Sequence, residues 1–404
     1  MSVSDRWLLP DGVEELLPAE AWRMEALRRR VLDLFERHGY DLVVPPLIEY
    51  LESLLTGTGN DLDLSTFKLT DQLSGRLMGV RADMTPQVAR IDAHRLNQET
   101  PSRLCYVGPT LRTRPEGVGA SRSPLQVGAE LYGHAGIESD REVIALMLAM
   151  LRAAGAQEIH LDLGHVEIYR ALMQQLALPA DAEAELFDAL QRKANAEIRA
   201  LVERLNLPQA QSDALCALPS LFGGADAVLE RARKVLLSLV PQIESALNEL
   251  QSLATDLRTC LGVSEIHLDL AELRGYQYHT GVVFAAYVPG QGQAVALGGR
   301  YDHVGEVFGR ARPATGFSSD LRTLLALDAA ASGALASGEG RTYPRAGIFA
   351  PASSDAALLS KMETLRAEGL RVVQALPGQV GDAAAMGCNE QLVQDGGKWK
   401  VVAL

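Results

Sequence analysis

Apolar positions near the start of the chain repeat at helical spacing. They fall every three or four residues across Leu27–Phe35, and Gly39 follows. This pattern predicts an amphipathic helix over about Ala19–His38 that ends at the glycine. Further helices are predicted at Met84–Arg95, Asp140–Ala153 and about Phe317–Leu327.

Short apolar or alternating runs predict strands between these helices. The predicted strands are Leu42–Val44, Phe67–Leu69, Leu77–Val80, Leu104–Val107, Leu125–Tyr132, Glu158–Leu163, Glu265–Leu270, Val282–Tyr287 and Gln293–Leu297. Phe67–Leu69 and Leu77–Val80 form a hairpin in this interpretation. The sheet is predicted to be mostly antiparallel and meandering with helices beside it, which is an α+β arrangement.

The hexapeptide EIHLDL occurs twice, at Glu158–Leu163 and at Glu265–Leu270. It is too short to indicate a duplicated domain, so we expect two strands with similar places in one sheet. Leu, Ala, Glu and Arg predominate between the copies, which predicts a helical insertion at about residues 178–260 within a core of residues 1–328. A small-residue linker is predicted at 329–344, followed by a small C-terminal α/β domain at 345–404.

Composition and charge exclude several classes of protein. The 404 residues are 47% apolar and 22% charged, which is typical of a globular protein. The start MSVSDRWLLPDG does not resemble a signal peptide and the apolar runs are too short to span a bilayer, so we expect a cytoplasmic protein. The four cysteines have no CxxC spacing, which indicates neither a zinc site nor a disulfide framework. The net charge of −13 gives no general attraction for nucleic acid.

Common nucleotide and hydrolase signatures are missing from the sequence, but polar residues gather near strand ends. There is no GxxxxGK[ST], no GxGxxG opening a helix, no HExxH and no GxSxG. A pocket for a free amino acid needs a cation and several acceptors on a rigid frame. The residues that could supply them are Arg81, Asp83, Thr85, Arg112, Arg114, Gln126, Glu130, Arg274, Tyr278, His279, Arg300, Tyr301 and Asp302.

Six motifs give the sequence a family resemblance. They are PDGVEELLP, VRADMTPQVAR, YVGPTLR, QVGAELYG, RGYQYHTGVVF and GGRYDHVGEVFGRARPATGF. Their order and spacing from about Pro10 to Leu327 resemble the core of a class II histidyl-tRNA synthetase. The resemblance implies an antiparallel sheet flanked by helices and interrupted by a helical insertion.

The motifs that hold ATP in that family are altered here. The acidic position of the second class II motif is Arg114, and the arginine of the third falls on Thr323, with Arg322 one place early. One residue is a rotation of ~100° along a helix, so Arg322 cannot take the place of the missing side chain. The C-terminal part is also short for an anticodon-binding domain.

The amino-acid pocket of the family is largely kept. The resemblance implies that Asp83, in place of a family glutamate, holds the ligand ammonium with Thr85 and Gln126, and that Arg112 lies near the carboxylate. Glu130 and Tyr278 would face the imidazole of histidine. The remaining implied contacts are Arg274, His279, which replaces a family tyrosine, and Tyr301.

A synthetase core with these departures resembles the regulatory subunits of ATP phosphoribosyltransferase. The resemblance implies a subunit without catalytic residues, cofactor or metal, which partners the short-form catalytic subunit in histidine biosynthesis. It would activate that enzyme and mediate feedback inhibition by L-histidine, with a homodimer inside a larger hetero-oligomer and no tRNA or membrane partner. Two alternatives remain open: a divergent histidyl-tRNA synthetase or histidine-activating enzyme, and a dimeric scaffold with a vestigial pocket.

Overall fold

The structure is a computed structural model, and its residues group into two compact units. It describes residues 7–56, 60–115, 117, 120–263, 265–273, 275–276, 278–331, 347–379 and 381–404. The larger unit comprises Met1–Glu15 and Trp22–Leu335, and the smaller unit comprises Leu16–Ala21 and Ala336–Leu404.

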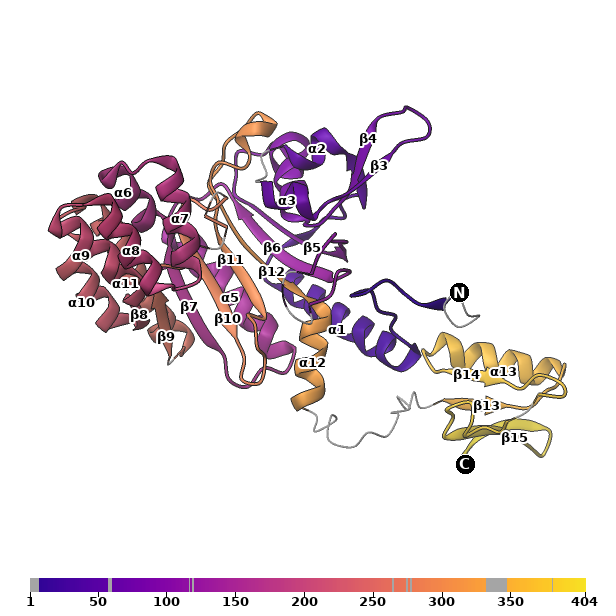
Figure 1. Ribbon diagram of the computed structural model, residues 1–404. Helices are drawn as coiled ribbons and strands as arrows, with labels where there is room; N and C mark the ends of the chain where they lie inside the picture. The colour runs from indigo at the N-terminus through magenta and orange to yellow at the C-terminus, as the bar shows by residue number, and fades with distance from the viewer. Residues whose placement is uncertain are drawn as a thin grey trace. The chain divides into compact units, whose positions relative to one another are not determined.

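A nine-stranded sheet forms the centre of the larger unit (Figure 1). In spatial order its strands are β1 (Asp41–Leu42), β5 (Ser102–Pro109), β6 (Leu125–Tyr132), β12 (Ala314–Asp320), β11 (Ala296–Arg300), β10 (Val282–Tyr287), β7 (His160–His165), β9 (Ile266–Asp269) and β8 (Phe222–Gly224). Neighbours are antiparallel except β1 with β5 and β7 with β9. The predicted mostly antiparallel sheet is confirmed, and β10, β11 and β12 form a meander. The meander does not extend over the whole sheet, because β12 pairs with β6 and β10 pairs with β7, which are distant in sequence.

The two copies of the hexapeptide lie in neighbouring strands. Leu161 of β7 is opposite Ile266 of β9, and Asp162 is opposite His267. The prediction that both copies occupy similar places in one sheet is therefore confirmed.

Helices pack against the sheet on the buried faces that the apolar pattern predicts. Helix α1 (Pro18–Arg37) buries Phe35, which meets Phe317 of β12 edge to face at 6.1 Å. Helices α5 (Ile137–Ala153) and α12 (Leu321–Ala331) also pack on β12 and β6. The helix predicted from Phe317 is corrected to begin at Leu321, since periodicity alone does not separate a buried strand from a helical segment.

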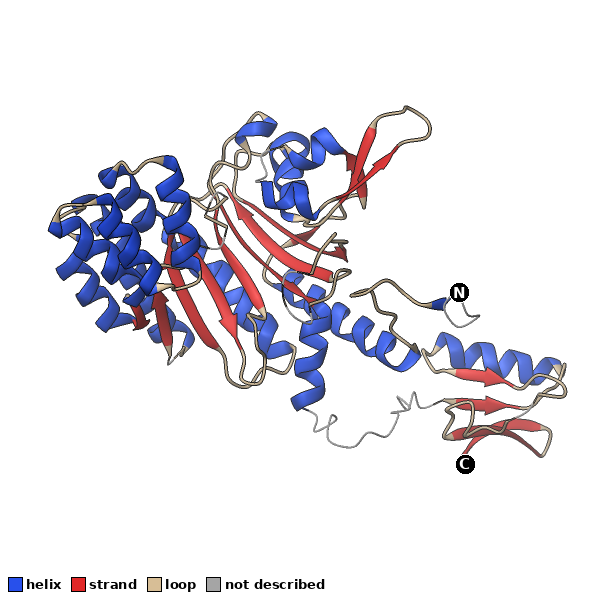
Figure 2. Cartoon of the chain, viewed as in Figure 1, coloured by secondary structure: helices blue, strands red, loops and turns tan. Residues whose placement is uncertain are grey.

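The predicted helical insertion forms a helical layer at one end of the sheet (Figure 2). It follows α6 (Val166–Leu176) and comprises α7 (Ala180–Gln191), α8 (Asn195–Leu205), α9 (Gln209–Ala217), α10 (Ala225–Leu236) and α11 (Glu244–Leu261). Strand β8 lies within this segment and pairs with β9, so the insertion also supplies the last strand of the sheet.

A second sheet has three strands in the order β2-β4-β3. Its strands are β2 (Ile48–Tyr50), β3 (Phe67–Thr70) and β4 (Leu77–Val80), with short helices α2 (Leu51–Leu55) and α3 (Asn60–Ser65) between β2 and β3. The predicted hairpin of β3 and β4 is confirmed. The predicted helix after it is α4 (Thr85–Arg90), which continues as a π-helical turn over Ile91–Leu96.

The smaller unit has its own sheet and core. Its elements are β13 (Ile348–Ala350), α13 (Ala356–Ala367), β14 (Val372–Gln374), β15 (Glu390–Asp395) and β16 (Lys398–Ala403). The sheet order is β14-β13-β15-β16, and Leu358, Met362 and Leu392 form part of its core. Residues 332–344 of the predicted linker lie outside the described residues. Among the residues described, no helix is both long and apolar enough to cross a bilayer.

Candidate functional site

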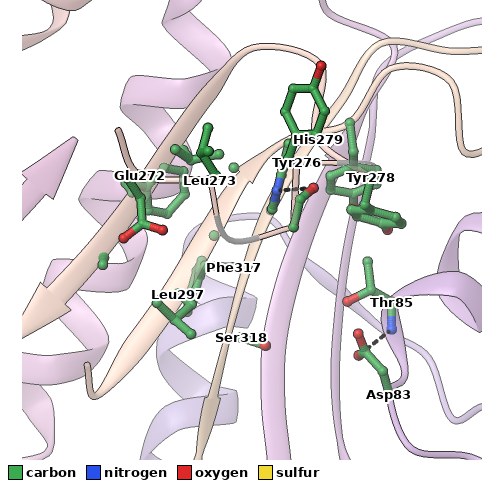
Figure 3. Close-up of a pocket in the computed structure, with 18 of the residues that line it drawn as sticks. Asp83, Thr85, Glu272, Leu273, Tyr276, Tyr278, His279, Leu297, Phe317 and Ser318 are labelled. Carbon is green, nitrogen blue, oxygen red and sulfur yellow. Dashed lines mark hydrogen bonds between the residues drawn. The ribbon is translucent and has the colours of Figure 1, made fainter. Parts of the chain in front are cut away.

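A cavity of about 710 Å³ lies over the middle of the nine-stranded sheet. Figure 3 shows Asp83 and Thr85 on one side of it and Glu272 and Leu273 on the other. Eight of the nine predicted site residues line the cavity: Asp83, Thr85, Arg112, Gln126, Glu130, Tyr278, His279 and Tyr301. The ninth, Arg274, lies outside the described residues.

Glu130 on β6 is buried, with 1% of its surface exposed, and three hydroxyl groups donate to its carboxylate. Oε1 accepts from the Tyr106 hydroxyl at 2.9 Å and from the Thr85 hydroxyl at 3.1 Å, and Oε2 accepts from the Tyr301 hydroxyl. Tyr301 is also buried, and its hydroxyl lies 3.4 Å from that of Tyr132. The acid is therefore held by side chains from three other segments, namely β5, the start of α4 and the residue after β11.

Burial is the main influence on the proton of Glu130. Loss of water raises the pKa of its carboxyl to about 8, and the negative charge of Asp83 acts in the same direction. The hydroxyl donors of Tyr301, Tyr106 and Thr85 lower this pKa because they stabilise the ionised form. Near neutral pH the free carboxyl is thus mostly protonated, and a bound cation or N–H donor favours its ionised form.

Asp83, just before α4, forms a second polar group beside Glu130 and its hydroxyl donors. Oδ1 of Asp83 accepts from the Gln126 amide at 2.7 Å and from the backbone N–H of Thr85 at 3.1 Å. The other end of the Gln126 amide accepts from the backbone N–H of Met84 at 2.9 Å. Gln126 and Glu130 stand four residues apart on β6, as predicted for side chains that share one face.

Aromatic side chains form the wall between these polar groups and the far end of the cavity. The rings of Tyr278 and Tyr301 stack at 5.0 Å, and His279 meets Tyr278 edge to face at 5.5 Å. Within the described part of the chain, the buried Tyr278 hydroxyl has no hydrogen-bond partner. Arg170 of α6 donates to the backbone carbonyl of His279 at 3.1 Å and so fixes the segment that carries this wall.

Two arginines of the predicted polar set, Arg81 and Arg300, make structural contacts and do not line the cavity. Arg81 is buried and donates to the carbonyls of Pro45 and Pro109 at 2.6 and 2.8 Å. Arg300 is buried and donates to Asp140 at 2.8 Å, which joins the end of β11 to α5. Neither lines the cavity, whereas Arg112 does and donates to the carbonyl of Ala82 at 3.3 Å.

The altered positions of the second and third class II motifs lie away from the cavity. Arg114 is exposed, and of the described residues neither it, Arg322 nor Thr323 lines the cavity. The Arg322 guanidinium instead donates to the backbone carbonyl of Glu14 at 3.1 Å. The expectation that Arg322 does not replace the missing arginine agrees with this geometry.

Sequence reasoning missed two groups of residues around the cavity. Tyr106 holds Glu130, and only the pairing of β5 with β6 reveals that it comes near this acid. The helical insertion supplies Phe187, Asp188 and Gln191, for which the sequence gives no local signal. A further signal was present but unused, because both hexapeptide copies place their aspartates, Asp162 and Asp269, in the lining.

Comparisons with known proteins match both units. The family described as histidyl-tRNA synthetase matches residues 12–324, and the C-terminal domain of the ATP phosphoribosyltransferase subunit HisZ matches residues 345–402. The chain is 57% identical over 405 residues to a protein of Thioalkalivibrio sulfidiphilus and 54% identical over 405 residues to one of Azotobacter vinelandii. Each alignment covers 100% of both chains, and both proteins are named ATP phosphoribosyltransferase regulatory subunit.

Solved structures agree with these matches. A structure from Bacillus halodurans, titled as an ATP phosphoribosyltransferase regulatory subunit/histidyl-tRNA synthetase, is similar with a TM-score of 0.80 and 29% identity, covering 94% of this chain and 95% of that one. A histidyl-tRNA synthetase from Nostoc has a TM-score of 0.74 at 20% identity, covering 98% and 97% respectively, which shows the shared fold alone. The chain belongs to the family of ATP phosphoribosyltransferase regulatory subunits, built on a core like that of the class II histidyl-tRNA synthetases.

Proposed function

We propose that this chain is the histidine sensor of an ATP phosphoribosyltransferase. In this proposal L-histidine binds in the cavity over the sheet, and the chain conveys its presence to a short-form catalytic subunit. Without histidine the chain activates that subunit in the first step of histidine biosynthesis, and with histidine it mediates inhibition. The family to which the chain belongs supports the regulatory role, and the geometry of the cavity supports histidine as the effector.

The observation that carries the proposal is that two acidic side chains, Asp83 and Glu130, line the same end of the cavity. Asp83, with Gln126 and Thr85, offers acceptors for an ammonium group, and Glu130 offers a buried acceptor for an imidazole N–H. Among the described residues the Tyr278 hydroxyl has no partner, and such a group is costly to bury unless a ligand atom completes its hydrogen bonding.

The other proposed contacts complete the amino-acid site. Arg112 supplies a cation for the ligand carboxylate, while Tyr301 and His279 border the ring. Arg274 belongs to the proposed set through its place in the RGYQYHTG motif, and it lies outside the described residues.

A non-catalytic role fits the altered ATP motifs. Transfer to or from ATP requires positive charge placed against the developing charge on phosphorus. The chain has Thr323 where the third motif has arginine, and Arg322 is turned to Glu14. ATP and phosphoribosyl pyrophosphate are therefore assigned to the catalytic partner, and this chain needs no cofactor or metal for its own role.

The proposed assembly is a homodimer inside a larger hetero-oligomer. Exposed apolar side chains follow one another along the segment that holds the edge strand β1 and strand β2, namely Leu42, Val44, Leu47 and Ile48. Apolar surface of this kind favours association with another chain. The charge of −13 gives no attraction for tRNA, and we expect the complex to work in the cytoplasm.

Histidine acts by linkage in this proposal. A ligand shifts an equilibrium between two subunit arrangements only through its different affinity for them. The decisive experiment purifies the chain with a short-form catalytic subunit and measures transferase activity with and without L-histidine, alongside calorimetry. Activation with no calorimetric binding of histidine and no inhibition would favour a scaffold with a vestigial pocket.

A further inference from the structure

Three glycines lie in one row across the floor of the cavity. Gly316 of β12 is opposite Glu130 of β6 on one side and Gly299 of β11 on the other. The row continues through Val283 of β10 to Gly164 of β7. Directly opposite residues share one face of a sheet, and all five line the cavity.

Gly316 leaves the space that the Glu130 carboxylate occupies. A Cβ atom at position 316 would lie 1.5 Å from Oε2 of Glu130 and 2.5 Å from its carboxyl carbon. Non-bonded carbon atoms prefer roughly 3.5–4 Å, so the two groups cannot coexist. The side chain of Glu130 therefore crosses from its own strand and lies over the neighbouring one.

The φ angle gives no separate reason for glycine at this position. Gly316 is not among the glycines with positive φ, and it lies within a regular antiparallel ladder. One backbone atom is also close, because the carbonyl oxygen of Ala129 would lie 2.8 Å from the added Cβ. A side chain at 316 thus meets the Glu130 carboxylate and the backbone of β6, and removal of the carboxylate relieves the first contact only.

We infer that Gly316 is a positioning residue, which sets the place of the Glu130 carboxylate and thereby of the site's buried acid. Oε2, the atom nearest the missing Cβ, is the one that accepts from Tyr301, whose ring stacks on Tyr278. Displacement of this oxygen separates the acid from the aromatic wall. The consequence for histidine binding rests on the proposed function, whereas the steric relationship between Gly316 and Glu130 does not.

The test is a set of full-length variants that separates space from charge. Gly316→Ala introduces the clash, Glu130→Ala/Gly316→Ala removes the carboxylate that it meets, and Glu130→Gln/Gly316→Ala keeps a side chain of the same size without the charge. The single variants Glu130→Ala and Glu130→Gln complete two double-mutant cycles. Gly224→Ala is the control, because its Cβ would meet nothing within 4 Å.

Thermal unfolding should place Gly316→Ala roughly 5 °C or more below the wild type, since overpacking a closed site is destabilising. The Glu130→Ala double variant should recover part of this loss, and the Glu130→Gln double variant should not. Gly224→Ala should unfold like the wild type. Additive losses in the Glu130→Ala cycle, or equal recovery in both double variants, would overturn the inference. If Gly316→Ala alone were too unstable to purify, each double variant would be compared with its Glu130 single variant, and an equal loss in both pairs would overturn the inference.

Calorimetry with L-histidine gives the second readout. Folded Gly316→Ala should bind at least about tenfold more weakly than the wild type, although Glu130 is still present. Unchanged affinity in this variant would contradict the positioning role. If the wild type itself bound no histidine, the proposed function would fail, and the unfolding cycles would still decide the inference.

Discussion

The Tyr301 hydroxyl donates a hydrogen bond to Oε2 of Glu130 and so joins the segment after β11 to the middle of β6. Hydrogen bonds to charged groups contribute about 1.5–3 kcal/mol, which corresponds to roughly tenfold or more in affinity. Tyr301→Phe should therefore weaken L-histidine binding about tenfold and raise the pKa of Glu130 further, because this hydroxyl lowers it. Calorimetry across pH measures both effects. Tyr50→Phe, on β2, is a control that should bind normally.

Glu130→Gln tests the acid itself with little change in volume. We expect inhibition of the transferase complex by histidine to weaken at least about tenfold, since a carboxylate acceptor is lost. Activation and complex formation should persist. Activity assays with a histidine titration measure the first effect, and size-exclusion chromatography of the complex measures the second. Undiminished inhibition would place the histidine site elsewhere, and loss of the complex would mean that Glu130 is structural.

Histidine affinity should depend on pH in a bell-shaped manner. The free carboxyl of Glu130 has a pKa of about 8, and a free imidazole has one of about 6.5. One proton shared between the acid and the ligand ring favours the complex, so affinity should be flat between these values. Below about 6.5 the free ligand gains a proton that the complex must lose, and above about 8 the free protein lacks the proton that the complex must take up.

The same measurement of histidine affinity against pH on Glu130→Gln tests whether Glu130 causes the decline above pH 8. Glutamine does not titrate, so the decline above pH 8 should disappear while the decline below pH 6.5 remains. Calorimetry in two buffers of different ionisation enthalpy should find little net proton exchange at pH 7. Large proton release at pH 7 would mean that the complex binds without the shared proton.

No histidine-dependent ATP–pyrophosphate exchange is expected from this chain. Thr323 supplies no charge to the nucleotide and Arg322 contacts Glu14, so the transition state lacks the cation of the third motif. Isotope exchange with a histidyl-tRNA synthetase as positive control makes the measurement. Robust exchange would favour the histidine-activating alternative over the sensor.

Arg300 should contribute stability through its buried ion pair and not through ligand contact. Arg300→Ala leaves Asp140 buried without its cation, which costs about 3–5 kcal/mol in comparable pairs. Arg192→Ala removes an exposed arginine paired with Asp188 and Glu197, for which we expect little change in the free energy of unfolding. Chemical denaturation of both variants measures the contrast, and equal losses would contradict it.

Local patterns predicted most elements of the fold. Short, largely apolar runs identified β6 and β10 with the observed bounds, and the hairpin of β3 and β4 followed from two apolar runs around a polar turn. The sheet order was not accessible in this way, since nothing local indicates that β12 inserts between β6 and β11. The strand before α12 was assigned to the helix because a short buried run fits either structure.

The candidate site, like the fold, was predicted where the signal is local and missed where it depends on tertiary packing. Motif resemblance identified eight cavity residues, Arg112 among them. The polar pattern alone did not distinguish Arg112, which lines the cavity, from Arg81 and Arg300, which are buried in structural contacts. Tyr106 and the residues of α7 reach the cavity through tertiary packing alone. Gly316 is the clearest case, because its role depends on the one residue that faces it across the strand pair.

The placement of β12 between β6 and β11 makes the cavity a property of the complete larger unit. Its walls come from segments that meet only when the whole sheet has assembled, so a partly folded chain contains no site. A ligand that occupies it binds the native state alone. At a concentration one hundred times its dissociation constant, such a ligand adds about 2.7 kcal/mol to the free energy of unfolding. The proposed effector, L-histidine, would then also stabilise the protein, which would resist unfolding most strongly under the conditions in which the proposed feedback inhibits the transferase.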